Sequence, residues 1–364
     1  MEFQLSKIKL FDPFIDYKEE QIIKKVLKSH FWASGAGTGN VLKFERFFRK
    51  YIDSNDCIAV NSGTSALNLA LSLQNIKNKE VILPSLTFVS TVNAVIINGG
   101  IPIFVDIDPK TLCLDHSKIK KLISKKTGVI LPVHFAGMPC NLDQISKICR
   151  NNNLVLIEDA AHAAGSSYKK KKIGKHGMAV CFSFHPTKNL AMPTGGLISI
   201  NHKNHKKIRK TLESRRWCGI DNRHDVFYDV KELGWNYYMN EFSAGIGLVQ
   251  LSKLNKMNKI RQKIAKKYDK EISIDSKIPF SNDCNYHLYW ILVKNRTKFK
   301  KKMSEAKIET GVHYRPVHTM SFYKTKTKLP ITEKVAKQIV TIPIHPNLSE
   351  YDTDKIIKSV NAFS

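Results

Sequence analysis

The sequence has no apolar run that approaches the roughly 20 residues needed for a membrane-spanning helix. Its first residues, Met1-Glu2-Phe3-Gln4, lack the basic-then-apolar pattern of a secretory signal. The 7 cysteines are an odd number, with no C-x-x-C pair and no dense spacing that would indicate a disulfide framework. These absences predict a cytoplasmic protein with reduced thiols and no membrane association.

Acidic residues are also scarce, with 31 Asp and Glu against 59 Lys and Arg, for a formal net charge of +28. A basic surface suits nucleic acid, because binding releases counterions. The lysines, however, are spread along the chain, and no ladder of basic and aromatic residues is present that would stack bases. We therefore expect a solvated basic surface, which also attracts small phosphorylated ligands. A basic nucleic-acid-binding or regulatory protein on an enzyme scaffold stays the alternative from another class.

The chain of 364 residues is 42% hydrophobic, enough for a large core, and it contains no internal repeat or Pro/Gly/Ser linker. Runs typical of buried strands lie at 81–83, 101–105, 129–133, 154–157, 180–182 and 197–200, with helical spacing between them at 65–73, 89–97 and 142–149. This alternation predicts an α/β fold with a mostly parallel sheet, whose ligand lies at the carboxyl ends of the strands.

The pattern changes after about residue 200. Basic helical spacing covers 203–216, and a longer helical pattern runs from 240 to 268. The last hundred residues contain a strand at 289–293 and a helix at 301–307. We predict a large α/β domain at 1–250 and a smaller C-terminal α+β domain at 251–364.

Two segments have the composition of a ligand site. Residues 61–67, N-S-G-T-S-A-L, follow an apolar stretch and open a helix, and free N–H groups at a helix N-terminus bind phosphate. Residues 154–162 form a buried strand that ends in Glu158 and Asp159, and such an Asp can neutralise a protonated ring nitrogen. Helix capping by the Ser and Thr hydroxyls, or by Asp159, is the alternative for each segment.

A third segment, 181–188, reads C-F-S-F-H-P-T-K and places Lys188 after a strand and a turn among apolar and small residues. Burial near cations lowers the pKa of a lysine and makes it a nucleophile that forms Schiff bases. A fourth segment, 234–241, sets aromatic residues beside Asn236 at the start of a helix. Packing and capping are the alternative there.

In this order the four segments closely resemble the sugar aminotransferases of the DegT/DnrJ/StrS type, over nearly the whole chain. Further matching segments lie at 84–91, 132–134, 310–314 and 342–346. The resemblance implies the fold type I architecture of pyridoxal 5′-phosphate (PLP) enzymes. It also implies a transaminase that moves an amino group, with glutamate as the donor, to a keto group on a nucleotide-linked sugar. The product would be an amino sugar nucleotide for surface polysaccharide or a related glycan.

The resemblance also assigns roles by motif. Lys188 would hold PLP covalently, Asp159 would pair with the ring nitrogen, and His162 would lie near the ring hydroxyl. Phe88 would stack on the ring. The phosphate would be bound by Gly63, Thr64, Ser65 and Ser183, and by Asn236 of a neighbouring subunit, which implies a homodimer with shared sites. His313 and Tyr314 would touch the sugar, although packing explains them equally well. We expect no metal site, since His202 and His205 lack a partner set of ligands.

Two motifs depart from the family pattern. Residues 191–196 read A-M-P-T-G-G where the family has T-T-G-E-G-G, so a glutamate of the substrate wall is replaced by Thr194. Residues 236–239 read N-Y-Y-M where the family has N-Y-R-M, so Tyr238 replaces a charged contact. Sugar dehydratases of the same fold are a second alternative, but they carry His in place of the lysine, which Lys188 argues against.

Overall fold

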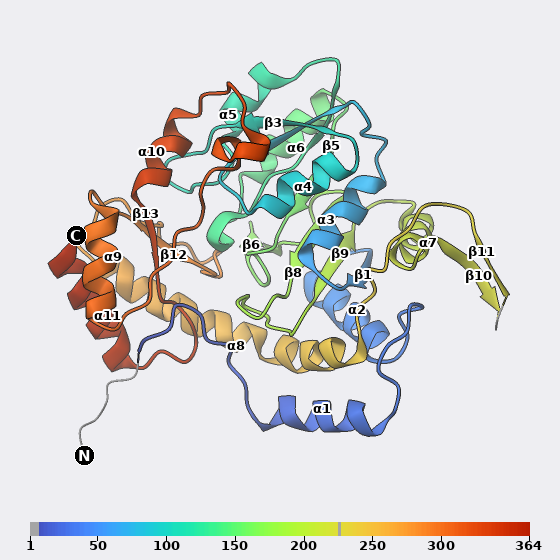
Figure 1. The fold of residues 1–364 in the computed structure, drawn as a ribbon, viewed down its shortest axis with the longest axis horizontal. Helices are drawn as coiled ribbons and strands as arrows, with labels where there is room; N and C mark the ends of the chain where they lie inside the picture. The colour runs from blue at the N-terminus through green and yellow to red at the C-terminus, as the bar shows by residue number, and fades with distance from the viewer. Residues whose placement is uncertain (1–6, 225–226) are drawn as a thin grey trace.

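The computed structural model describes residues 7–224 and 227–364, without the side chains of 222–224. At its centre lies a seven-stranded sheet in the order β1-β9-β8-β5-β4-β2-β3 (Figure 1). Its strands are β1 Asp56–Val60, β2 Glu80–Pro84, β3 Ile101–Val105, β4 Thr127–Ile130, β5 Val155–Asp159, β8 Ala179–Ser183 and β9 Gly196–Ile200. Only β9 of this sheet runs antiparallel to its neighbours, so the predicted α/β fold with a mostly parallel sheet is confirmed.

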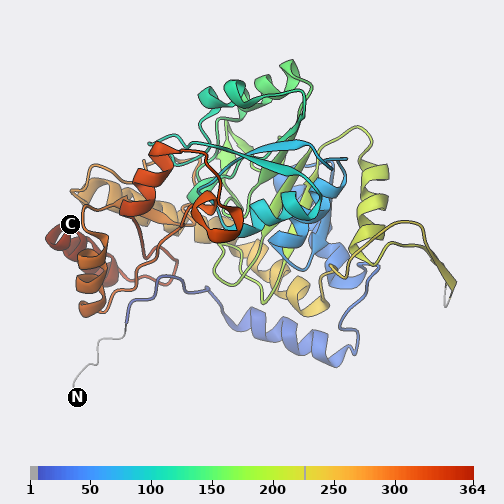
Figure 2. The ribbon, with the colours of Figure 1, turned by 45° about the horizontal axis from the view of Figure 1, so that its top comes forward.

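Helices cover both faces of the sheet (Figure 2). One core contains residues of α3 Gly63–Ser72, α4 Val89–Ile97 and α7 His205–Arg216. The other contains residues of α2 Gly39–Ile52, α6 Leu142–Asn151 and α8 Glu241–Glu271. Successive residues of a strand belong to opposite cores, as Val81 and Ile82 of β2 do, because strand side chains alternate between the two faces. Apolar residues on both faces explain why these strands read as continuous apolar runs.

The C-terminal part is small and mixed. Two antiparallel strands, β12 Tyr289–Leu292 and β13 Ile339–Ile342, are accompanied by α9 Arg296–Glu305, α10 Pro330–Gln338 and α11 Glu350–Phe363. The α8 helix continues from the sheet into this part, and the predicted domain boundary at residue 250 falls inside it (Figure 1). The division into 1–250 and 251–364 stays a prediction.

Some predicted bounds were wrong. The strand predicted at 129–133 spans Thr127–Ile130, since Pro132 has no N–H to continue the ladder. The helix predicted at 301–307 spans Arg296–Glu305, because the Asn295 side chain accepts the Lys298 N–H and caps an earlier start. The basic helix predicted from 203 begins at His205.

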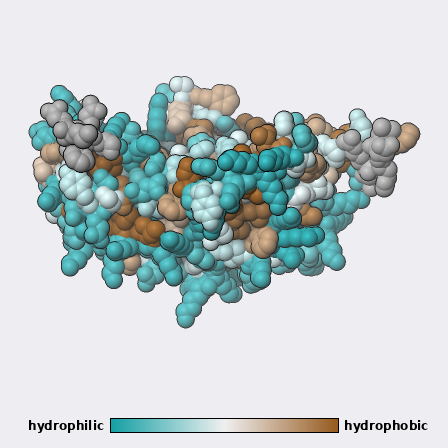
Figure 3. Space-filling view, turned by 90° about the horizontal axis from the view of Figure 1, so that it is seen from below, coloured by the Kyte–Doolittle hydropathy of each residue, from teal (hydrophilic) through white to brown (hydrophobic). Residues whose placement is uncertain are grey.

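Two features extend from the body. The α1 helix, Tyr17–Lys28, packs along α8, and the hairpin of β10 Ile220–His224 and β11 Phe227–Val230 projects outward (Figure 1). Both carry exposed apolar side chains, among them Leu27, Phe227 and Tyr228. The face seen from below has brown apolar patches between hydrophilic side chains (Figure 3). Short elements elsewhere in the described residues are α5 His116–Ile119, β6 Ser167–Tyr168, β7 Lys171–Lys172 and the 3₁₀ helices η1 Lys120–Leu122, η2 Phe135–Gly137, η3 Val317–Thr319 and η4 Ser321–Tyr323.

Across the part of the chain that the structure describes, no helix is both long and apolar enough to cross a bilayer. All seven cysteines are free thiols, and six of them are buried.

Candidate active site

A cavity of about 710 Å³ opens at the carboxyl ends of β2, β5 and β8, where the topology of a parallel sheet predicts a ligand. Its wall contains every residue that the sequence singled out for the site except Asn236. These residues are Gly63, Thr64, Ser65, Phe88, Asp159, His162, Ser183, Lys188, His313 and Tyr314. Gly63 and Tyr314, 251 positions apart in sequence, therefore meet in one cavity.

The turn at 61–65 lies at the N-terminus of α3, where Ser62 is the N-cap and its Oγ accepts the Ser65 N–H at 3.1 Å. Gly63 packs so tightly on β8 that an added Cβ would lie 2.7 Å from the Ser183 Cβ, so glycine is required there. The Ser65 hydroxyl donates to Asn61 Oδ1 at 2.6 Å. Capping is thus present, but it leaves the N-terminal end of the helix facing the cavity, where it favours an anion.

Asp159 is buried at the end of β5. Its Oδ2 accepts the Thr91 hydroxyl at 2.8 Å, and its Oδ1 accepts the Ala161 N–H at 3.0 Å. Burial raises the pKa of Asp159, opposed by these hydrogen bonds and by the charge of Lys188. No helix begins after it, so the capping alternative does not apply. Within residues 7–224 and 227–364 no cation forms an ion pair with this carboxyl group, which suits a cationic ring nitrogen from a ligand.

Lys188 lies in the turn after β8, partly exposed to the cavity. Desolvation lowers its pKa to about 8, while the charge of Asp159 raises it. About a tenth of the side chain is therefore the free amine at pH 7, far more than for a lysine with an ordinary pKa, and the amine is the form that attacks a carbonyl group. The nearest polar contact of Nζ is His287 Nε2 at 3.4 Å.

The opposite wall is aromatic. His162 is buried, its Nδ1 accepts the Ala136 N–H at 3.2 Å, and its Nε2 lies 3.0 Å from the Tyr314 hydroxyl. Burial, with the charge of Lys188, keeps the pKa of His162 well below its usual value. Phe88 is 57% exposed, with its ring centroid 6.0 Å from that of Tyr314. A flat ligand in the cavity would therefore meet ring faces instead of charges.

Asn236 is not in this cavity. It lies between β11 and α8, its side chain is exposed, and its carbonyl oxygen accepts Asn61 Nδ2 at 3.2 Å. The sequence expectation places it in a neighbouring subunit's site, and that stays a prediction.

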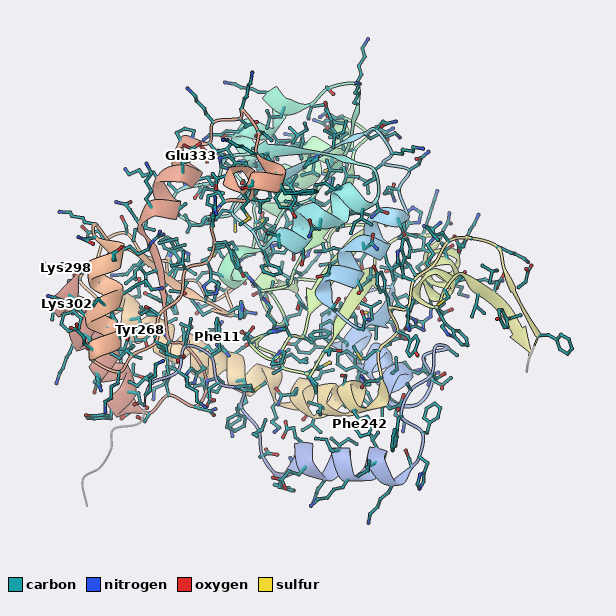
Figure 4. The ribbon with its side chains drawn as sticks, in the orientation of Figure 1. Phe11, Phe242, Tyr268, Lys298, Lys302 and Glu333 are labelled. Atoms are coloured by element: carbon teal, nitrogen blue, oxygen red, sulfur yellow. The ribbon has the colours of Figure 1, made fainter. Side chains whose placement is uncertain are left out.

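The structure adds three residues that sequence reasoning did not assign. Thr91 holds Asp159 and lies within the 84–91 segment that matched the family pattern. Phe11 and His287 also line the cavity, from the N-terminal segment and from the residues before β12. Figure 4 labels Phe11 between the C-terminal part and the central sheet. The sequence around Phe11 or His287 does not predict a role in the site, because each lies there only through packing between segments distant in sequence.

The polar groups of the cavity fit PLP. The helix N-terminus and the hydroxyls suit a phosphate, the buried carboxyl group suits a ring nitrogen, and the amine suits an aldehyde. No cluster of three or more His, Cys, Asp or Glu side chains suited to a metal occurs among the described residues.

Comparisons with known proteins agree with this chemistry. The model of the DegT/DnrJ/EryC1/StrS aminotransferase family matches residues 13–361. GDP-perosamine synthase of Escherichia coli O157:H7 is 33% identical over 99% of both chains. The spore coat polysaccharide biosynthesis protein SpsC of Bacillus subtilis is 33% identical over 96% of this chain and 95% of its own length.

The solved structure of the sugar aminotransferase CalS13 from Micromonospora echinospora superposes with a TM-score of 0.90, at 28% identity over 98% of this chain and 99% of its own. The aminotransferases of the matching family use PLP. With the family model covering almost the full length, this chain belongs to the DegT/DnrJ/EryC1/StrS aminotransferase family and is a PLP-dependent aminotransferase.

Proposed function

We propose that this enzyme transfers an amino group from glutamate to a keto group of a nucleotide-linked sugar, in the cytoplasm. The product is an amino sugar nucleotide used for a surface polysaccharide or a related glycan. The observation that carries the proposal is the 33% identity with GDP-perosamine synthase over 99% of both chains. The basic surface, with its net charge of +28, supports it by attracting a phosphorylated substrate.

In this proposal Lys188 binds PLP covalently. When free, its amine takes a proton from the carbon of the amino donor in one half-reaction and delivers a proton to the sugar carbon in the other. Bound PLP supplies an electron sink, provided that its ring nitrogen stays protonated. The buried carboxylate of Asp159 holds that proton in place, and Thr91 and Ala161 orient the carboxylate. Ser183 and the turn at Gly63 bind the phosphate, and Thr64 and Ser65 complete that turn.

The sugar lies against the aromatic wall in this proposal. Phe88 packs on the cofactor ring, and His162 lies at the ring hydroxyl. His313 is held by Thr341 Oγ1 at 2.8 Å, and with Tyr314 it faces the sugar. Thr194 also lines the cavity, so the wall that lacks the family's glutamate is uncharged at this position.

A substrate panel tests the proposed function. We expect the PLP-loaded enzyme to convert more than one equivalent of glutamate per site to 2-oxoglutarate only when a nucleotide-linked keto sugar is present, with a matching gain of one amino group on the sugar by mass spectrometry. The same sugars without the nucleotide are the control and should react far more slowly. Loss of water from the sugar without amination would favour the dehydratase alternative. Nucleic-acid binding by a protein without cofactor absorbance would favour the regulatory one.

We also propose a homodimer in which Asn236 completes the partner's phosphate site. The exposed apolar residues of α1 and of the projecting hairpin, such as Leu27 and Phe227, support an interface there. Stacking of Trp235 on Tyr237, with centroids 5.7 Å apart, fixes the backbone beside Asn236. A two-fold axis would then give each cavity one Asn236 from the other chain.

Mixing two inactive variants tests the shared site. In a heterodimer of Lys188→Ala with Asn236→Ala, one site carries both defects and the other carries neither. Random exchange of equal amounts should therefore restore activity at about one quarter of all sites. Exchange must be demonstrated separately, for instance with two affinity tags. Heterodimers without recovered activity, or an active monomer, would refute the shared site.

A further inference from the structure

His287 is a buried histidine at the end of the cavity where Lys188 lies. It is 2% exposed, and its Nε2 is 3.4 Å from Lys188 Nζ. Its Nδ1 is 3.3 Å from Asn189 Oδ1, so the ring spans the catalytic lysine and that lysine's neighbour in sequence. The Phe11 ring stacks on it, with centroids 5.8 Å apart at 22°. Both ring nitrogens thus have one defined protein partner each.

The orientation of the Asn189 amide is fixed by its other contacts. Its Nδ2 donates to the backbone carbonyl of Asn285 at 3.0 Å and to Asn258 Oδ1 at 2.9 Å. A backbone carbonyl can only accept, so the NH₂ group must point toward Asn285. Asn258 is oriented in turn by its Nδ2, which donates to the carbonyl of Ala164 at 3.1 Å. The Oδ1 of Asn189 is therefore the atom that faces His287.

This network determines the tautomer of His287. An amide oxygen can only accept, so Nδ1 must carry the proton that it donates to Asn189, and Nε2 of the neutral ring has a free lone pair. Four groups that can be cationic face the ring: Lys188, His162, Arg261 and His313. Together with burial, which is the larger cause, they keep the pKa of His287 well below its usual value. The ring is therefore neutral, with an acceptor toward the lysine.

We propose that His287 is a positioning residue for the amine of Lys188: its bare Nε2 accepts one N–H and leaves the nitrogen lone pair of the amine free to take a proton. The opposite tautomer would donate Nε2–H into that lone pair and block it. The same acceptor also receives an N–H from the ammonium form, so His287 can hold the lysine on both sides of the proton transfer. The inference rests on the acid–base role proposed for Lys188.

The tautomer can be measured without turnover. In full-length protein freed of PLP and labelled with ¹⁵N-histidine, two-bond ¹H–¹⁵N correlation distinguishes the two neutral tautomers and the imidazolium. The signals of His287 among the 13 histidines are those that vanish in His287→Gln. We expect the neutral form with the proton on Nδ1 at neutral pH. A proton on Nε2, or an imidazolium, would overturn the proposal.

Two substitutions test the consequence. Glutamine offers an amide oxygen near the position of Nε2, whereas leucine fills the space without an acceptor. We expect kcat of His287→Leu to fall by about 10- to 100-fold, as for the loss of one hydrogen bond to a charged group, with partial recovery in His287→Gln. His318→Gln is the control, because His318 is equally buried but bonded to Ser85 and Glu333.

The melting temperature of each variant shows whether a lower kcat comes from loss of the fold or from loss of the contact that positions the Lys188 amine. Near-wild-type kcat in a folded His287→Leu protein would refute the proposal, and so would a glutamine variant that is folded but as slow as the leucine one. Borohydride should still attach PLP to Lys188 in each variant. Attachment to another lysine would instead refute the underlying assignment of Lys188, so the two failures can be told apart.

Discussion

Replacing Lys188 with alanine is expected to lower kcat by about 10²- to 10⁴-fold or more, the contribution of one positioned acid–base group. The fold should persist, because the amine is desolvated in the cavity and, among the residues that the structure describes, its one polar side-chain contact is with His287. Removing a group whose pKa burial has lowered to about 8 relieves a desolvation cost instead of breaking an ion pair. The measurement is steady-state turnover beside the melting temperature.

Lys172→Ala is the matched control, since Lys172 is also half-buried with a pKa lowered by burial, but its Nζ donates to the Gly165 carbonyl. It should retain normal kcat. In wild-type enzyme, borohydride reduction followed by peptide mapping should place the PLP mass on Lys188 alone. A label on a different lysine, or near-normal turnover in Lys188→Ala, would contradict the assignment.

Asp159→Asn is expected to lower kcat by between about 10²- and 10⁴-fold and to weaken retention of PLP, since breaking a buried charge pair costs about 3–5 kcal/mol. The amide has the same shape. Its oxygen can still accept the Ala161 N–H, and its NH₂ group can donate to the Thr91 hydroxyl, so the local structure should survive. Only the negative charge opposite the ring nitrogen is lost.

The melting temperature of the cofactor-free protein is a second measurement on Asp159→Asn, and there we expect no loss. Burial raises the pKa of Asp159, so in cofactor-free protein the ionised carboxylate opposes folding once the pH exceeds that pKa. At pH 7 we expect cofactor-free Asp159→Asn to melt no lower than wild type, while added PLP raises its melting temperature less. A cofactor-free variant that melts several degrees lower would make Asp159 a structural residue.

Local motifs made part of this site predictable. The segments at 61–67, 154–162 and 181–188 each contain the turn that follows a strand, so their chemistry is contiguous in sequence. The His287–Asn189 contact could not be predicted, because it joins residues 98 positions apart through an asparagine network with no apolar period. The end of β4 was misplaced for a different and local reason, because Pro132 has no N–H for the ladder, although Leu131 still donates to the Ile82 carbonyl.

The unbroken α8 helix has a mechanical consequence. Its 31 residues contain no proline and extend about 1.5 Å each, so one stiff rod runs from beneath the sheet to the C-terminal strands. Near one end Gly247 packs against Met192, and near the other the Tyr268 hydroxyl donates to the Pro343 carbonyl. The helix therefore connects the segment near Lys188, which it contacts at Met192, with the C-terminal strands near His287. We therefore expect ligand entry to depend on side chains and surface loops, while the backbone segments that carry Lys188 and His287 keep their relative positions.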